Sequence, residues 1–139
     1  ELKRRGLDGL ALAAKAEMEI AQLDEADRIT FLKDIGIEEP ARDRFIRASY
    51  RLLDLISFFT SGEDEVRAWT ITQGTVARKA AGKIHSDIER GFIRAEVVAY
   101  EDFIALGSES KCKEAGKLRL EAKDYVVKDG DIVHFRFAV

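Results

Sequence analysis

The side chains best suited to chemistry lie within residues 78–94, where five cations surround two carboxylates and an imidazole. The cations are Arg78, Lys79, Lys83, Arg90 and Arg94, the carboxylates are Asp87 and Glu89, and the imidazole is His85. Such cations can contact the phosphates of a nucleic-acid backbone. Phosphate contacts position a protein on a nucleic acid but do not recognise its base sequence. A solvated surface of an ordinary protein also carries clusters of this size, so both interpretations stay open here.

No combination of these side chains has a catalytic or metal-binding spacing. His85, Ser86 and Asp87 are consecutive, whereas the members of a hydrolase triad meet in space, each directed at the next. Ser86 and Asp87 instead suit the capping of a helix or turn. The two histidines, His85 and His134, have no zinc-ligand spacing with each other or with Cys112. The P-loop motif GxxxxGK is also missing. We therefore predict no catalytic residue, no metal site and no cofactor for this chain itself.

The composition indicates a folded, non-secreted protein. The chain has 139 residues, of which 46% are hydrophobic and 35% charged, enough for a core without disulfides. No apolar run is long enough to span a membrane, and the first residues lead into no signal core. A single cysteine suits the reducing cytoplasm. The net charge is −3, without a strongly basic stripe, so we expect no membrane contact and no DNA sequence readout.

The apolar spacing is helical in the first part of the chain. A short apolar run at 10–12 is consistent with the stub of a strand. Three helices are then expected: one with Ala16, Ile20 and Leu23 inward, a second capped by Asp24 that carries Ile29 and Leu32 inward and stops at Gly36, and a third from Pro40 that buries Phe45, Ile46, Leu52, Leu53 and Ile56.

After Gly62 the pattern becomes mostly strand-like. Strands are expected at 66–71, 93–100 and around 118–120, a short helix after a Thr75 cap, and helical pieces at 100–106 and 111–115. Asp129-Gly130 predicts a hairpin between 125–127 and 132–137, whose core face would hold Val133, Phe135, Phe137 and Val139. One helix over a small mixed sheet predicts a β-grasp, ubiquitin-like module in an α+β protein.

Several segments resemble the YchF (Obg-like) ATPase family. IHSDIERGFIRAEVVAYEDF, VRAWTI and KDYVVKDGDIVHFRF are similar to its TGS domain. RASYRLLDLISFFTSGEDEVRAW is similar to the link that precedes this domain, and AAKAEMEIAQL to the segment with the fifth G-motif. The resemblance implies a β-grasp TGS domain at 61–139. It also implies that 1–60 are the mostly helical, C-terminal remnant of an α/β P-loop nucleotide-binding domain.

The resemblance further implies a cytoplasmic parent protein that binds ATP or GTP with Mg²⁺, hydrolyses it and associates with ribosomes. The parent's P-loop and switch segments would lie upstream, so this chain would not catalyse hydrolysis. Of the nucleotide contacts only the backbone of Ala14 and Lys15 would remain, and Ala13 stands where the family usually has Ser. The candidate RNA or ribosome contacts are Arg78, Lys79, Lys83, His85, Arg90 and Arg94.

Three functions are compatible with these observations. The TGS module can dock on the ribosome or its RNA, or regulate the parent ATPase by docking on the upstream nucleotide-binding domain. Alternatively, it can bind a protein or its own parent through a sheet edge, with no contact to nucleic acid. The mixed acids and bases around His85 suit a protein surface as well as RNA, so the sequence does not choose between the ribosome-docking and protein-docking functions.

Overall fold

The chain divides into two compact units, Glu1–Leu53 and Asp54–Val139, which are described separately. The computed structural model describes residues 4, 9–37, 39–62 and 65–138. The division falls before the boundary expected between residues 60 and 61, because Leu55–Ser61 is a strand of the second unit and not the end of a helix.

The first unit consists of three helices, α1 (Ala14–Ala21), α2 (Glu25–Asp34) and α3 (Ala41–Leu52). Asp24 caps α2 as predicted, because its carboxylate accepts a hydrogen bond of 2.9 Å from the Asp27 amide. Ile20 and Leu32 are the buried apolar side chains among the described residues of this unit. They hold α1 and α2 but leave α3 without a buried residue.

The inward faces predicted for α2 and α3 are therefore wrong in part. Phe45, Leu52 and Leu53 are 60%, 73% and 61% exposed, and Ile29 is 50% exposed. The apolar run at 10–12 forms no strand. These side chains have the spacing of a buried face, but the described residues of this unit provide no surface to cover them.

Within the described residues, no helix combines the length and the apolar character that crossing a membrane requires.

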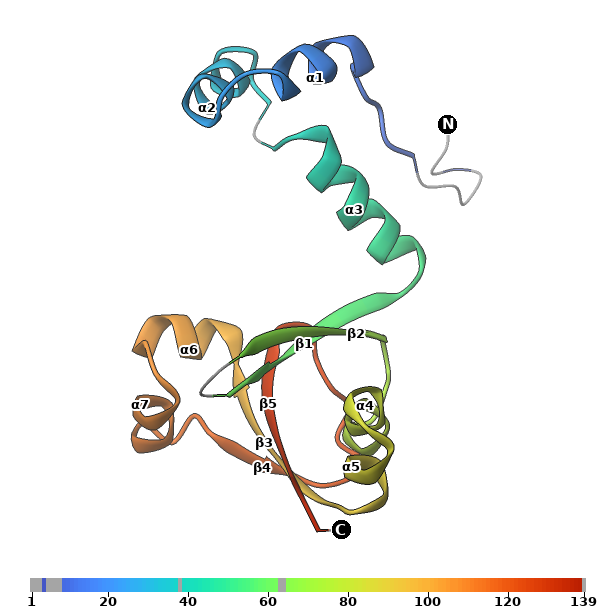
Figure 1. The fold of residues 1–139 in the computed structure, drawn as a ribbon, viewed down its shortest axis with the longest axis vertical. Helices are drawn as coiled ribbons and strands as arrows, with labels where there is room; N and C mark the ends of the chain where they lie inside the picture. The colour runs from blue at the N-terminus through green and yellow to red at the C-terminus, as the bar shows by residue number, and fades with distance from the viewer. Residues whose placement is uncertain (1–3, 5–8, 38, 63–64, 139) are drawn as a thin grey trace. The chain divides into compact units, whose positions relative to one another are not determined.

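The second unit is a β-grasp fold, which confirms the α+β class (Figure 1). Its sheet has the order β2-β1-β5-β3-β4, with β1 parallel to β5 and the other neighbours antiparallel. Its elements along the chain are β1 (Leu55–Ser61), β2 (Val66–Thr72), α4 (Ala77–Ile84), α5 (Ser86–Arg90), β3 (Phe92–Ala99), α6 (Tyr100–Leu106), α7 (Glu109–Glu114), β4 (Arg119–Glu121) and β5 (Asp131–Phe137).

The core lies between α4 and one face of the sheet. Phe58 and Phe135 meet edge to face there, with ring centroids 6.0 Å apart. Helix α4 contributes Ala77, Ala80 and Ala81, which are fully buried and lie on one side of the helix. Small side chains at these positions allow the helix to approach the sheet closely. Consequently, the charged residues of α4 are left on its solvent side.

The hairpin predicted at Asp129-Gly130 is wrong, although a turn is present. Strand β5 pairs with β1 and β3, whereas Val126 makes an isolated bridge with Val76. The Asp129 carboxylate accepts a hydrogen bond of 2.8 Å from the Ser57 amide, and the Gly130 amide donates to the Ser57 carbonyl at 2.8 Å. The turn therefore connects β5 to β1, a long-range pairing that a local sequence motif cannot reveal.

Glycine is required at position 91 because a side chain would not fit there, and not because the residue has a positive φ. Its φ is −86°, a value open to any residue. A Cβ atom at this position would lie 1.9 Å from the carbonyl oxygen of Ala138, whose amide donates to the Gly91 carbonyl at 3.0 Å. The backbone after β5 thus runs directly against the turn that leads into β3.

We predict that Gly91→Ala destabilises the chain by about 1–3 kcal/mol, because the methyl group forces two backbone segments apart. The measurement is urea unfolding followed by circular dichroism. Gly62→Ala is the matched control, since a Cβ there meets only an ordinary contact of 3.6 Å with the Glu65 carbonyl oxygen. Equal stability of Gly91→Ala and the wild type would contradict the close approach.

Candidate nucleic-acid interface

The solvent side of α4 and α5 carries most of the predicted cations. Arg78, Lys79 and Lys83 project from α4, Arg90 ends α5, and His85 lies at the junction of the two helices. All five residues are exposed. We call this surface the α4–α5 face. It exists because the alanines of α4 occupy the opposite side of that helix.

Glu89 reaches from α5 to α4 and reduces the positive charge there. Its carboxylate accepts a hydrogen bond of 2.7 Å from Lys79 Nζ, and its carbonyl accepts one of 3.1 Å from Arg78 Nε. The bond from Lys79 lowers the pKa of Glu89. Gly82 makes this arrangement possible, because a Cβ there would lie 2.2 Å from the Glu89 carboxylate. Lys79 is therefore a partner of Glu89 before any ligand arrives.

Asp87 and His85 organise the start of α5. The Asp87 carboxylate pairs with Arg90, which lowers the pKa of Asp87. Imidazole Nδ1 of His85 accepts a hydrogen bond of 3.2 Å from the Asp87 amide and thereby caps α5. The His85 ring thus has a defined structural role, which does not require a phosphate.

The structure does not bring together all six of the predicted RNA or ribosome contacts, because Arg94 lies apart from the other five. Arg94 lies on the other face of the sheet from α4, since its neighbour Ala95 belongs to the core and Arg94 is opposite Arg136 on β5. Among the described residues, Lys83 makes no ion pair and Arg78 bonds only a carbonyl. Within this part of the chain, Lys83 therefore carries a charge without an ion-pair partner, and Arg78 makes no salt bridge, although its charge helps to lower the pKa of Glu89.

We predict that Lys79→Gln raises the pKa of Glu89 towards its ordinary value, because the main interaction favouring the carboxylate is lost. The measurement is a pH titration of the Glu89 carboxyl carbon by NMR. Lys83→Gln is the control and leaves this pKa unchanged. A Glu89 pKa that does not respond to Lys79→Gln would exclude the ion pair in solution.

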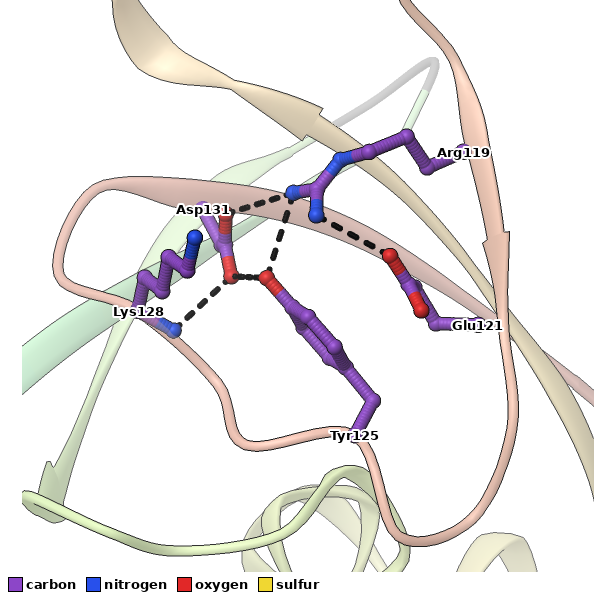
Figure 2. A network of polar contacts seen from close by, with 5 residues as sticks. All are labelled: Arg119, Glu121, Tyr125, Lys128 and Asp131. Atoms are coloured by element: carbon purple, nitrogen blue, oxygen red, sulfur yellow. Dashed lines mark hydrogen bonds and ion pairs between the residues drawn. The ribbon is translucent and has the colours of Figure 1, made fainter.

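A polar network that the sequence did not reveal joins β4, the segment that follows it and the start of β5 (Figure 2). Asp131 is a polar residue that is only 2% exposed. Its carboxylate accepts hydrogen bonds from the Tyr125 hydroxyl at 2.7 Å and the Lys128 amide at 2.8 Å, and Arg119 lies 3.4 Å away. Arg119 also bonds the Tyr125 hydroxyl and pairs with Glu121 at 2.9 Å. A buried carboxylate requires such partners.

This network fixes the segment 122–128 against the beginning of α4. The Tyr125 carbonyl accepts a hydrogen bond of 2.7 Å from the Ala77 amide, and the Lys123 carbonyl accepts one of 3.3 Å from the Arg78 amide. The first amides of a helix have no partner within the helix itself. The segment thus caps α4 with its backbone, in place of the predicted Thr75 cap, whose hydroxyl donates to the Thr72 carbonyl.

The alternation of residues along β5 indicates that Asp131 is buried, and this could have pointed to the network. Asp131 precedes Val133 and Phe135 by steps of two, so it falls on the core face of β5. A carboxylate at such a position needs a hydrogen-bond donor nearby. Its place directly after Asp129-Gly130 suggested only a turn residue. His134, by contrast, is exposed on the opposite face of this strand.

We predict that Tyr125→Phe destabilises the chain by about 1–3 kcal/mol, because Asp131 loses a buried donor. Partial burial and the bond to Asp131 raise the pKa of Tyr125 above 10.0. The wild type therefore keeps this stabilisation below about pH 10 and loses it as the pH rises through the folded-state pKa. Urea unfolding at several pH values measures both effects. Tyr100→Phe, on an exposed ring, is the control, and equal losses from both variants would refute the role of Tyr125.

The nucleotide contacts expected at Ala14 and Lys15 remain a prediction. Ala14 and Lys15 are exposed at the beginning of α1, where Ala13 makes no side-chain capping bond. Cys112 is buried. Within residues 4, 9–37, 39–62 and 65–138, no group of three His, Cys, Asp or Glu side chains could hold a metal ion. The rings of Trp69 and Phe92 both pack against the core.

Comparison with known proteins identifies relatives over nearly the whole chain. The family model YchF-GTPase_C, described as "Protein of unknown function (DUF933)", matches residues 55–138. The chain is 56% identical over 136 residues to the "Ribosome-binding ATPase YchF" of Haemophilus influenzae and 56% identical over 130 residues to that of Bacillus subtilis. These alignments cover 98% and 94% of this chain but only 38% and 36% of the relatives.

A solved structure agrees with this relationship. The Schizosaccharomyces pombe YchF GTPase superposes with a TM-score of 0.76 at 38% identity, covering 85% of this chain and 31% of that one. The chain therefore spans less than two fifths of the length of these relatives.

Proposed function

This chain belongs to the YchF family, and we propose that its β-grasp unit docks the parent ATPase on the ribosome through the α4–α5 face. The relatives from H. influenzae and B. subtilis are named ribosome-binding ATPases. The observation that carries the proposal is that Arg78 and Lys83 make no salt bridge with any described residue, on an exposed surface whose other cations, Lys79 and Arg90, are paired with carboxylates. Ribosomal RNA phosphates are the partner that such charges suit best.

We infer that nucleotide turnover belongs to the part of the parent that this chain does not include. ATP or GTP with Mg²⁺ would bind there, and the helical unit 1–53 would complete the nucleotide-binding domain, with the backbone of Ala14 and Lys15 near the base. The small share of the relatives that this chain covers supports this assignment. Docking by the β-grasp unit would then regulate hydrolysis by the parent in the cytoplasm.

Co-sedimentation with purified ribosomes tests the docking surface. Two phosphate contacts predict a log–log salt slope of about −1.4 to −1.8, so binding weakens about tenfold between roughly 50 and 200 mM salt. We predict that the double variant Arg78→Glu and Lys83→Glu no longer pellets at the lower salt concentration.

The control is the double variant Lys111→Glu and Lys113→Glu, which makes the same change of charge on the exposed side of α7. It is expected to pellet like the wild type. Pelleting of the Arg78 and Lys83 double variant at the wild-type level would reject the α4–α5 face. Absence of pelleting by the wild-type chain at both salt concentrations would instead leave protein docking, without nucleic acid, as the function of the unit.

A further inference from the structure

A second surface, at the open edge of the sheet beside β3 and β4, has the features of a peptide-binding groove. A hollow of about 450 Å³ separates the first residues of β3 from the end of β4 and the segment that follows it. We call it the β3–β4 groove. Its lining consists of Phe92, Ile93, Arg94, Leu120, Glu121, Ala122 and Lys123.

The groove exists because β4 is shorter than β3. The two strands pair only at Ala95–Val97, opposite Arg119–Glu121. Beyond Glu121 the chain leaves the sheet towards α4, where the Lys123 carbonyl accepts a hydrogen bond from the Arg78 amide. The backbone of 92–94 therefore has β5 on one side and the groove on the other. An unpaired strand edge of this kind is a template for another extended chain.

The chemistry of the groove is both apolar and cationic. Ile93 and Leu120, which both line the hollow, are 56% and 57% exposed. Arg94 and Lys123 make no ion pair within the described residues. The neighbouring acids are already engaged, since Glu121 pairs with Arg119 and Glu96 pairs with Arg136.

The cross-strand neighbours of Arg94 add to this charge. Arg94 lies directly opposite Arg136, and like charges at such positions are destabilising. Glu96 relieves only Arg136, at 2.5 Å. A carboxylate supplied from outside would relieve Arg94 as well.

We propose that the β3–β4 groove binds an extended, acidic segment of a protein partner, which adds to the sheet alongside β3. Alternate apolar side chains of the segment pack on Ile93 and Leu120. Its carboxylates pair with Arg94 and Lys123. The open strand edge and the aliphatic floor favour a peptide over RNA, because a nucleic acid uses neither. This assignment does not rest on the ribosome-docking function, since it concerns different side chains.

NMR titration of the ¹⁵N-labelled 139-residue chain tests the groove. The probe is a capped heptapeptide of alternating Val and Glu, compared with a heptapeptide of alternating Val and Lys and with an oligouridylate of the same length. The expected result is that the Val–Glu peptide alone shifts the amide signals of Ile93, Arg94, Ala122 and Lys123.

Two charge variants complete this experiment. The double variant Arg94→Glu and Lys123→Glu is expected to weaken binding of the Val–Glu peptide about tenfold, because two attractive contacts become repulsive. The double variant Lys111→Glu and Lys113→Glu is expected to bind like the wild type. Absence of shifts, equal shifts with the Val–Lys peptide, preference for the oligouridylate, or no effect of the Arg94 and Lys123 changes would each overturn the proposal.

Discussion

The buried carboxylate of Asp131 is the constraint on which the β-grasp unit depends. A charge with 2% exposure is tolerated only when hydrogen bonds replace its water, and here Tyr125, Lys128 and Arg119 do so. These partners come from β4 and from the segment between β4 and β5. Satisfying one carboxylate therefore holds that segment in place, and its backbone in turn caps α4 through Ala77.

The position of α4 determines which charges are available to a partner. Its three alanines pack on the sheet and leave Arg78, Lys79 and Lys83 in solvent. The acids of α5 then neutralise part of this surface. The chain segment that caps α4 also forms one wall of the β3–β4 groove, so the two proposed binding surfaces share a structural support. They are formed by different side chains and differ in chemistry, because only the groove combines charge with exposed aliphatic side chains.

Local patterns in the sequence predicted much of this fold. The strand at Val66–Thr72, the helix at Tyr100–Leu106, the Asp24 cap and the core positions Val133 and Phe135 follow from periodicity or capping chemistry alone. Long-range pairing was not predictable in this way. The sequence assigned the residues of β1 to the end of a helix and a turn, and it assigned Asp129-Gly130 to a hairpin. Both assignments are wrong because the structure of each segment depends on pairing with a strand that is distant in the sequence. Arg94 was grouped with the α4 cations for the same reason, since adjacency in sequence does not reveal the face of a sheet.

The most direct test of this account is amide hydrogen exchange of the Asp131→Asn variant. If the Asp131 network holds the segment that caps α4, the amides of Ala77 and Arg78 should exchange faster by a larger factor than the amide of Val97. The Val97 amide, in the buried centre of β3, reports overall unfolding. Equal acceleration at all three amides, or unchanged exchange at Ala77 and Arg78, would show that α4 is positioned without Asp131 and would contradict the account.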